Sequence, residues 1–193
     1  LGWMAAFVLA VIVFYKFGDA MLGRMAGVFY VDMGFTKIEI ANYTKSIGLA
    51  ATLLGVGVGG WVCIRVGIMR AMFLGAFLMM VTNLAFALLA ASGKDFGLLA
   101  TVVFFDNLTG GMATTAFVAY LSGLCHVSFT ATQFALLTSL MAFGRTLLAT
   151  TSGVMAEAMG WTGFFVATTA LAVPGLFLLL WLRRYPLSIR SAE

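Results

Sequence analysis

Hydrophobic residues recur in six long runs along this chain, separated by short stretches that contain charged residues, glycine or threonine. A helix that crosses a membrane needs about 20 mostly apolar residues, and each run reaches that length. We therefore expect six transmembrane helices, with the approximate ranges 3–31, 37–64, 70–91, 97–124, 131–158 and 162–182. Residues 186–193 would form a tail outside the membrane.

Two of the expected helices begin with the capping-box pattern, in which the first and fourth side chains satisfy free N–H groups at a helix start. Thr36 and Glu39 match the pattern at the second expected helix. Thr130 and Gln133 match it at the fifth. Both copies lie where the apolar runs already predict a helix start.

The composition indicates an all-α membrane protein. Of 193 residues, 63% are hydrophobic and 9% are charged, whereas a soluble domain has about 25% charged residues. Lipid must therefore surround much of the chain. The basic residues lie singly, so we expect no nucleic-acid partner. The two cysteines are far apart and lack metal-ligand spacing, so we expect no metal site.

Lysine and arginine predict the orientation, because cytoplasmic loops are enriched in both. The residues on one expected side are Arg65, Arg70, Arg183, Arg184 and Arg190, and those on the other side are Lys37 and Lys94. This places both ends of the chain in the cytoplasm. The chain begins at Leu1 inside an apolar run, without the pattern of a signal peptide, so we expect a fragment of a longer protein.

Apart from Lys37, Glu39 and Arg70 at the starts of their spans, charged residues within the expected spans occur only in the first two helices of each group of three. A charge in the hydrocarbon region costs at least about 2.5–3.5 kcal/mol, so such residues usually face protein or a water-filled cavity. They are Lys16, Asp19, Arg24, Lys45, Asp106, Arg145 and Glu157. This distribution favours two inverted three-helix repeats, an arrangement common in transporters, whose binding sites lie near the midplane of the membrane.

Four of these charges are expected to converge on one polar site. At 1.5 Å per residue, Asp19, Arg145 and Asp106 lie roughly 18, 20 and 13 Å from the outer ends of their helices. Lys16 lies one turn from Asp19 on the same helix face. The alternative is that these residues form buried ion pairs that only fix helix packing. For Asp106 a proton-carrying role is a second possibility, because a carboxylate in apolar surroundings binds a proton more readily.

The second expected helix carries a stripe of residues spaced three and four apart, which places them on one helix face. They are Lys45, Gly48, Thr52, Gly55 and Gly59. Small residues at this spacing allow membrane helices to pack closely. The alternative is that the stripe slides against a partner helix during a conformational change.

Signatures of membrane enzymes are missing from the sequence. It contains neither HExxH nor GxSxG, and a single histidine excludes a histidine-rich metal site. The segment 16–19 (KFGD) lacks the first glycine of the GxGD pattern of intramembrane aspartyl proteases. We therefore expect no enzymatic activity and no cofactor.

Several segments, in order, resemble AmpG-type muropeptide permeases of the major facilitator superfamily. They are 15–19 (YKFGD), 106–112 (DNLTGGM), 116–120 (AFVAY) and 129–137 (FTATQFALL), followed by Gly144-Arg145 and Gly160-Trp161. The resemblance covers nearly the whole chain but only helices 7 to 12 of a twelve-helix fold. It implies the C-terminal half of a proton-driven symporter in a bacterial inner membrane, which imports anhydro-muropeptides for cell-wall recycling.

The resemblance also implies that Lys16, Asp19, Lys45, Asp106 and Arg145 line the C-terminal wall of the central cavity, and their chemistry predicts their roles. Lys16, Lys45, Asn107 and Arg145 would bind the substrate, and Asp19 and Asp106 would couple proton movement. The cytoplasmic loop motif of the superfamily, in outline GxxxDRxGxxR, matches Gly60, Arg65, Gly67 and Arg70 in the segment 60–70 (GWVCIRVGIMR). Ile64 replaces the acidic residue of that motif, which puts its gating charge network in doubt.

The sequence therefore predicts a six-helix membrane bundle, half of a major facilitator fold, that works with a six-helix N-terminal half absent from this chain. The membrane proton gradient would drive transport of anhydro-muropeptide or a related small solute. Two alternatives stay open. The transporter could carry other peptides or coenzyme A esters, or the chain could be a membrane adaptor that transports nothing.

Overall fold

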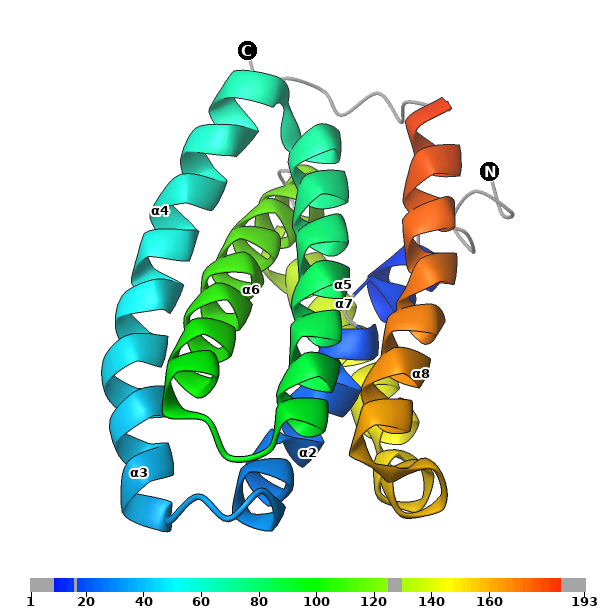
Figure 1. Cartoon of the computed structure of the whole chain (residues 1–193). Coiled ribbons are helices and arrows are strands. Elements are labelled where there is room, and N and C mark those ends of the chain that lie inside the picture. Colours follow the sequence, from blue (N-terminus) through cyan, green and yellow to red (C-terminus); the bar gives the residue numbers. More distant parts are fainter. Residues whose placement is uncertain (1–8, 16, 125–129, 185–193) are drawn as a thin grey trace.

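The computed structural model describes residues 9–15, 17–124 and 130–184, and none of these residues forms a strand. Residues 9–14 are helical and are followed by α2 (Phe17–Asp32), α3 (Lys37–Asn42), the π-helical segment η1 (Tyr43–Gly48) and α4 (Leu49–Val66). Next come α5 (Ile68–Ser92), α6 (Phe96–Leu124), α7 (Thr130–Ala149) and α8 (Ser152–Arg184). Figure 1 shows α4 and α8 at opposite sides of the bundle, with α5 and α6 between them.

Three of the expected spans match continuous helical stretches to within two residues at either end. The range 37–64 corresponds to α3, η1 and α4, which continue into one another from Lys37 to Val66. The ranges 70–91 and 97–124 correspond to α5 and α6. Gly67 separates α4 from α5 with a φ of 87°, a conformation that glycine adopts without steric cost.

The first expected span, 3–31, is not one uninterrupted helix in the described part. Residues 9–14 are helical, Tyr15 lies in a turn, and α2 begins at Phe17. The Tyr15 hydroxyl donates to the backbone carbonyls of Met72 on α5 and Ala113 on α6, at 3.1 and 3.3 Å. The helical residues 9–14 therefore end next to a residue whose side chain lies between two other helices, a tertiary contact that the hydropathy pattern does not predict.

The fifth expected span, 131–158, is wrong as a single helix. Helix α7 ends at Ala149, and the chain becomes helical again at Ser152. The Thr150 hydroxyl and the Thr150 backbone N–H both bond to the carbonyl of Leu147, and such local bonds compete with the continuing helix. Within α8, Gly160 has non-helical angles (φ 68°, ψ 171°), so this bend separates the fifth and sixth expected runs.

The capping box predicted at Thr36 is confirmed. Its hydroxyl accepts from the Glu39 backbone N–H, and the Glu39 carboxylate accepts from the Thr36 N–H at 2.7 Å. The second predicted box depends on the side chain of Thr130, which lies outside the described side chains.

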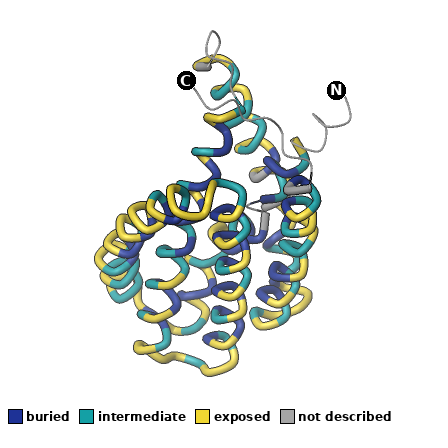
Figure 2. Tube along the Cα trace, turned by 90° about the horizontal axis from the view of Figure 1, so that it is seen from above, coloured by how far each residue is buried: buried dark blue, intermediate teal, exposed yellow. Residues whose placement is uncertain are grey.

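Two clusters of buried side chains hold the bundle together. One surrounds Tyr15, Phe117 and Tyr120, and the other surrounds Phe29 and Phe165. The Tyr15 and Phe117 rings stack with their centroids 4.9 Å apart. In Figure 2, buried positions lie between the helices, whereas exposed ones follow the outer faces.

The outer surface is suited to lipid. Among the described residues, four helical stretches are long and apolar enough to cross a membrane: Lys37–Val66, Ile68–Ser92, Phe96–Leu124 and Ser152–Leu182. Helix α7 adds a shorter apolar stretch, Ala131–Gly144. Large hydrophobic side chains such as Leu53 and Ile64 are exposed on α4. A surface of this kind needs the hydrocarbon of a membrane around it.

Candidate substrate and proton-coupling site

Glycines of α4 bring it against α6, and this contact positions the central polar residues. A Cβ atom added at Gly59 would lie 2.8 Å from the Met112 Cα atom, and one added at Gly55 would collide with the Leu108 carbonyl. Distances this short show that the two backbones touch. The predicted small-residue stripe is therefore a close packing surface.

Asp106 and Asn107 lie side by side on α6, and both are half-buried. The Asn107 amide nitrogen donates to the Val103 carbonyl at 2.8 Å, and its amide oxygen accepts from the Thr52 hydroxyl at 3.2 Å. Asn107 therefore cross-links α6 to the first turn of α4. This contact is not the substrate contact expected from the sequence, and substrate binding by Asn107 stays a prediction.

Asp106 on α6 lies near Tyr30 of α2. Asp19 lies in the first turn of α2, near Tyr15. Because Tyr30 is eleven residues beyond Asp19, these two residues lie roughly 16 Å apart along α2. The convergence of the two carboxylates on a single site stays a prediction.

Lys45 lies in η1 and is exposed. The sequence pattern places it on the same face as Gly48 and Thr52, but the wider π-helical turn changes that direction. Gly48 is buried against Asn107, whereas Lys45 is exposed. The π-helical turn interrupts the regular spacing between the two residues, and a shared face stays a prediction for Lys45.

Two of the predicted substrate-binding side chains cannot be placed. Lys16 lies outside the described residues. The backbone of Arg145 belongs to α7, but its side chain lies outside the described side chains. Their predicted roles stay predictions.

The four residues of the cytoplasmic loop motif lie at the junction of α4 and α5. Gly67 forms the turn between the helices, and Arg70 is exposed in the first turn of α5. The Arg65 guanidinium lies 5.6 Å from the centroid of the Trp61 ring. Ile64, at the position of the missing acid, is 86% exposed. Arg65 therefore uses an aromatic ring as a partner within its own helix, a cation–π contact.

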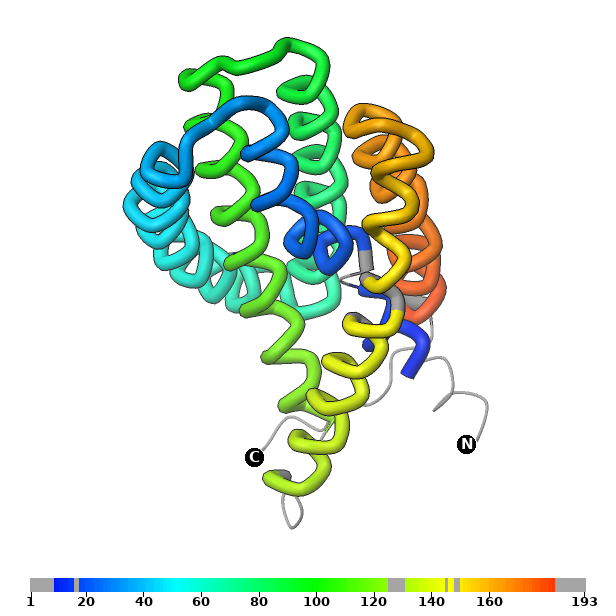
Figure 3. Tube along the Cα trace, turned by 90° about the horizontal axis from the view of Figure 1, so that it is seen from below, coloured from blue at the N-terminus to red at the C-terminus, as the bar shows by residue number. Residues whose placement is uncertain are grey.

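A cluster at the opposite end of the bundle was not expected from the sequence. The Lys94 ammonium lies 3.2 Å from the Glu39 carboxylate and donates to the Gly34 carbonyl at 2.9 Å. It also lies over the rings of Phe35 and Phe96. In Figure 3 the loop before α6 and the segment before α3 are seen together at this end. From the sequence, Lys94 predicts only the orientation of the chain, because its partners in the cluster are distant in the chain.

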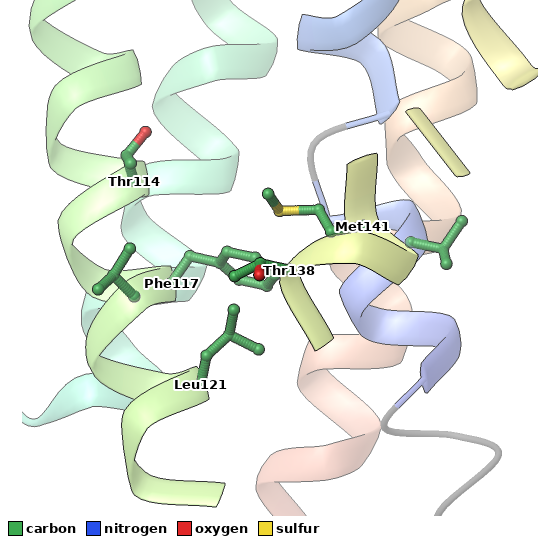
Figure 4. A pocket seen from close by; sticks show the side chains of 7 residues that line it. Thr114, Phe117, Leu121, Thr138 and Met141 are labelled. Atoms are coloured by element: carbon green, nitrogen blue, oxygen red, sulfur yellow. The ribbon is translucent and has the colours of Figure 1, made fainter. Parts of the chain in front are cut away.

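An apolar pocket of about 240 Å³ lies between α6, α7 and the helical residues 9–14. Figure 4 shows Phe117 and Leu121 of α6 facing Met141 of α7 across it. Its full lining is Val13, Thr114, Phe117, Val118, Leu121, Thr138 and Met141. The hydroxyls of Thr114 and Thr138 donate to carbonyls of their own helices, so the pocket favours apolar groups.

Comparison with known proteins identifies relatives over most of the chain. The chain is 41% identical over 174 residues to the anhydromuropeptide permease of Escherichia coli strain K12, which covers 90% of this chain and 35% of that protein. It is 39% identical over 178 residues to the putative transporter AmpG 4 of Rickettsia conorii, covering 92% of this chain and 43% of that protein. No family model matches the chain.

The chain is homologous to the C-terminal half of AmpG-type permeases. A third relative, the putative transporter AmpG 1 of Rickettsia prowazekii, is 31% identical over 180 residues, which are 93% of this chain and 41% of that protein. The chain therefore spans less than half the length of these AmpG relatives. The expected fold class is confirmed as an all-α, multi-pass membrane bundle, the C-terminal half of a major facilitator fold.

Proposed function

We propose that this chain is the C-terminal half of a proton-coupled transporter that imports anhydro-muropeptides across a bacterial inner membrane. The observation that carries the proposal is the 41% identity, over 174 residues, to a protein named anhydromuropeptide permease. The N-terminal partner would be a second six-helix bundle of the same polypeptide. Alternating access needs two bundles that rock about a site between them.

The substrate would contact positively charged side chains on the face of this bundle that lies toward the proposed N-terminal half. Anhydro-muropeptides carry carboxylates, which pair well with ammonium and guanidinium groups. Lys45 supports this role because it is exposed in a segment that packs against the central helix α6. Lys16 and Arg145 complete the proposed set, and Asn107 would contribute by positioning or by direct contact.

Asp106 and Asp19 are the proposed proton-coupling residues. Asp106 lies about ten residues into a helix that is apolar enough to cross a membrane. A carboxylate at this depth faces protein or a water-filled cavity rather than lipid. Asp106 lies near Tyr30 of α2, so a movement of α2 relative to α6 would change the surroundings of the carboxylate.

Both ends of the chain would lie in the cytoplasm. Arg65 and Arg70, at the α4–α5 junction, mark the proposed cytoplasmic end, and Lys94 and Glu39 mark the opposite end. The positive-inside rule supports this orientation. Lipid would surround the outer faces of the bundle, as its exposed apolar side chains require.

The deciding experiment is uptake of labelled anhydro-muropeptide by the full-length protein in vesicles with an imposed proton gradient. We expect accumulation above the external concentration that collapses when an uncoupler is added. Vesicles without the protein are the control, and immunodetection confirms its insertion. Accumulation of coenzyme A esters or other peptides, but not of anhydro-muropeptide, would show that the transporter carries one of those solutes instead. Failure with every solute would favour the adaptor alternative. An adaptor, unlike a transporter, would keep its function when Lys16, Asp19, Asp106 and Arg145 are neutralised together.

A further inference from the structure

The π-helical segment η1 interrupts the long helical stretch that begins at Lys37. A π-helix has i→i+5 hydrogen bonds and therefore turns through a smaller angle per residue than an α-helix. In a regular α-helix, Lys45 would lie on the same helix face as Gly48, one turn away, and this face packs against α6. Both residues belong to η1, whose smaller rotation per residue separates their directions around the helix axis. Lys45 is exposed.

Asn107 packs against the end of this segment. A Cβ atom added at Gly48 would lie 3.3 Å from the Asn107 amide nitrogen, so the amide rests directly on the glycine. The Thr52 hydroxyl contacts the Asn107 amide oxygen at 3.2 Å and the Gly48 carbonyl at 2.9 Å. Asn107 is itself held on α6 by its bond to the Val103 carbonyl. The last residue of η1 is thus connected through Thr52 and Asn107 to the middle of α6.

We propose that Asn107 and Thr52 are positioning residues, which hold the π-helical turn and so keep Lys45 exposed. The turn by itself is less favourable than a regular helix, since π-helices are rare and short. Its persistence requires tertiary contacts, and the contact with Asn107 is available only because residue 48 has no side chain. This inference deepens the proposed function, in which Lys45 binds the substrate.

The test measures the exposure of position 45 directly. A Lys45→Cys variant is made in the full-length protein after its native cysteines have been replaced. Its rate of reaction with a membrane-impermeant thiol reagent is then compared between Thr52, Thr52→Val and Thr52→Ser backgrounds. Valine keeps the shape of threonine but has no hydroxyl, and serine keeps the hydroxyl. Lys37→Cys is the matched control, because α3 has no buried residues and position 37 stays exposed in either helix form.

We expect Thr52→Val to lower the reaction rate at position 45 by at most about fivefold, because the loss of one neutral hydrogen bond changes the ratio of the two helix forms by that factor. Thr52→Ser should restore the rate, and position 37 should not change. Gly48→Ala is a second, independent variant that should lower the rate in the same direction by displacing the amide of Asn107. Equal rates at position 45 in all four backgrounds would overturn the proposal.

Transport by full-length proteins that carry the Thr52 substitutions and keep Lys45 separates this inference from the proposed function. If Lys45→Ala leaves the KM for anhydro-muropeptide unchanged, the substrate role of Lys45 is wrong, but the reaction rates still decide whether Thr52 and Asn107 position it. If both inferences hold, Thr52→Val should raise KM with a smaller effect on kcat, and Thr52→Ser should restore KM. A structural defect alone would lower the amount of folded transporter without changing KM.

Discussion

The ammonium of Lys94 lies 3.2 Å from the carboxylate of Glu39, although the two residues are 55 positions apart in the chain. Lys94 also donates to the Gly34 carbonyl and lies over two aromatic rings. The pair therefore joins the loop before α6 to the start of α3. It lies at the end of the bundle opposite the junction of α4 and α5, where Arg65 and Arg70 lie.

We expect Lys94→Met to lower the melting temperature of the detergent-solubilised protein by a few degrees. An exposed ion pair contributes little by itself, but this substitution also removes the bond to the Gly34 carbonyl and the contact with the Phe35 ring. Lys37→Met is the control, since Lys37 is exposed on the same side of the bundle. An equal change in melting temperature for both variants would show that the cluster around Lys94 does not stabilise this end.

Replacing Gly55 with alanine should destabilise the protein by roughly 1–3 kcal/mol, the usual cost of inserting atoms into a well-packed interface. The added Cβ atom would collide with the backbone carbonyl of Leu108, which cannot rotate away. Gly57→Ala is the matched control on the same helix, because a Cβ atom there meets no atom within 4 Å. Thermal unfolding of the two purified variants gives the comparison. A stable Gly55→Ala variant would mean that α4 and α6 move apart easily.

Asp106→Asn should abolish proton-driven accumulation of substrate while leaving exchange of labelled for unlabelled substrate in place. Asparagine keeps the shape of the aspartate side chain, but its amide cannot bind and release a proton during transport. The measurement is uptake in vesicles with and without a proton gradient. Asp95→Asn is the control, since the Asp95 carboxylate accepts from the Leu98 N–H at the start of the same helix. Gradient-driven accumulation at the control rate would exclude Asp106 as the proton carrier.

Lys45→Ala should raise the KM for anhydro-muropeptide about tenfold, because hydrogen bonds to charged groups are worth more than neutral ones. Lys37→Ala provides a control with the same loss of charge in the neighbouring helix α3. Initial uptake rates over a range of substrate concentrations separate KM from kcat. The same KM in both variants would remove Lys45 from the substrate site.

The sequence alone determined the helical membrane architecture and several local features, because lipid burial and helix starts depend on nearby residues. Long apolar runs gave the ranges of α5 and α6, and Thr36 with Glu39 predicted a capping box that the structure confirms. Gly55 and Gly59 predicted close helix packing. In each case the signal lies within a few residues of the feature that it predicts.

Only the tertiary structure decided the exposure of Lys45 and the end of the helical residues 9–14 at Tyr15. The π-helical turn at Tyr43–Gly48 interrupts the regular helical spacing between Lys45 and Gly48. Asn107 bonds to Thr52, 55 residues away, and Tyr15 bonds to Ala113, 98 residues away. Contacts between residues so distant in sequence form only when the helices pack together, so no local pattern of hydrophobic and polar positions could encode them.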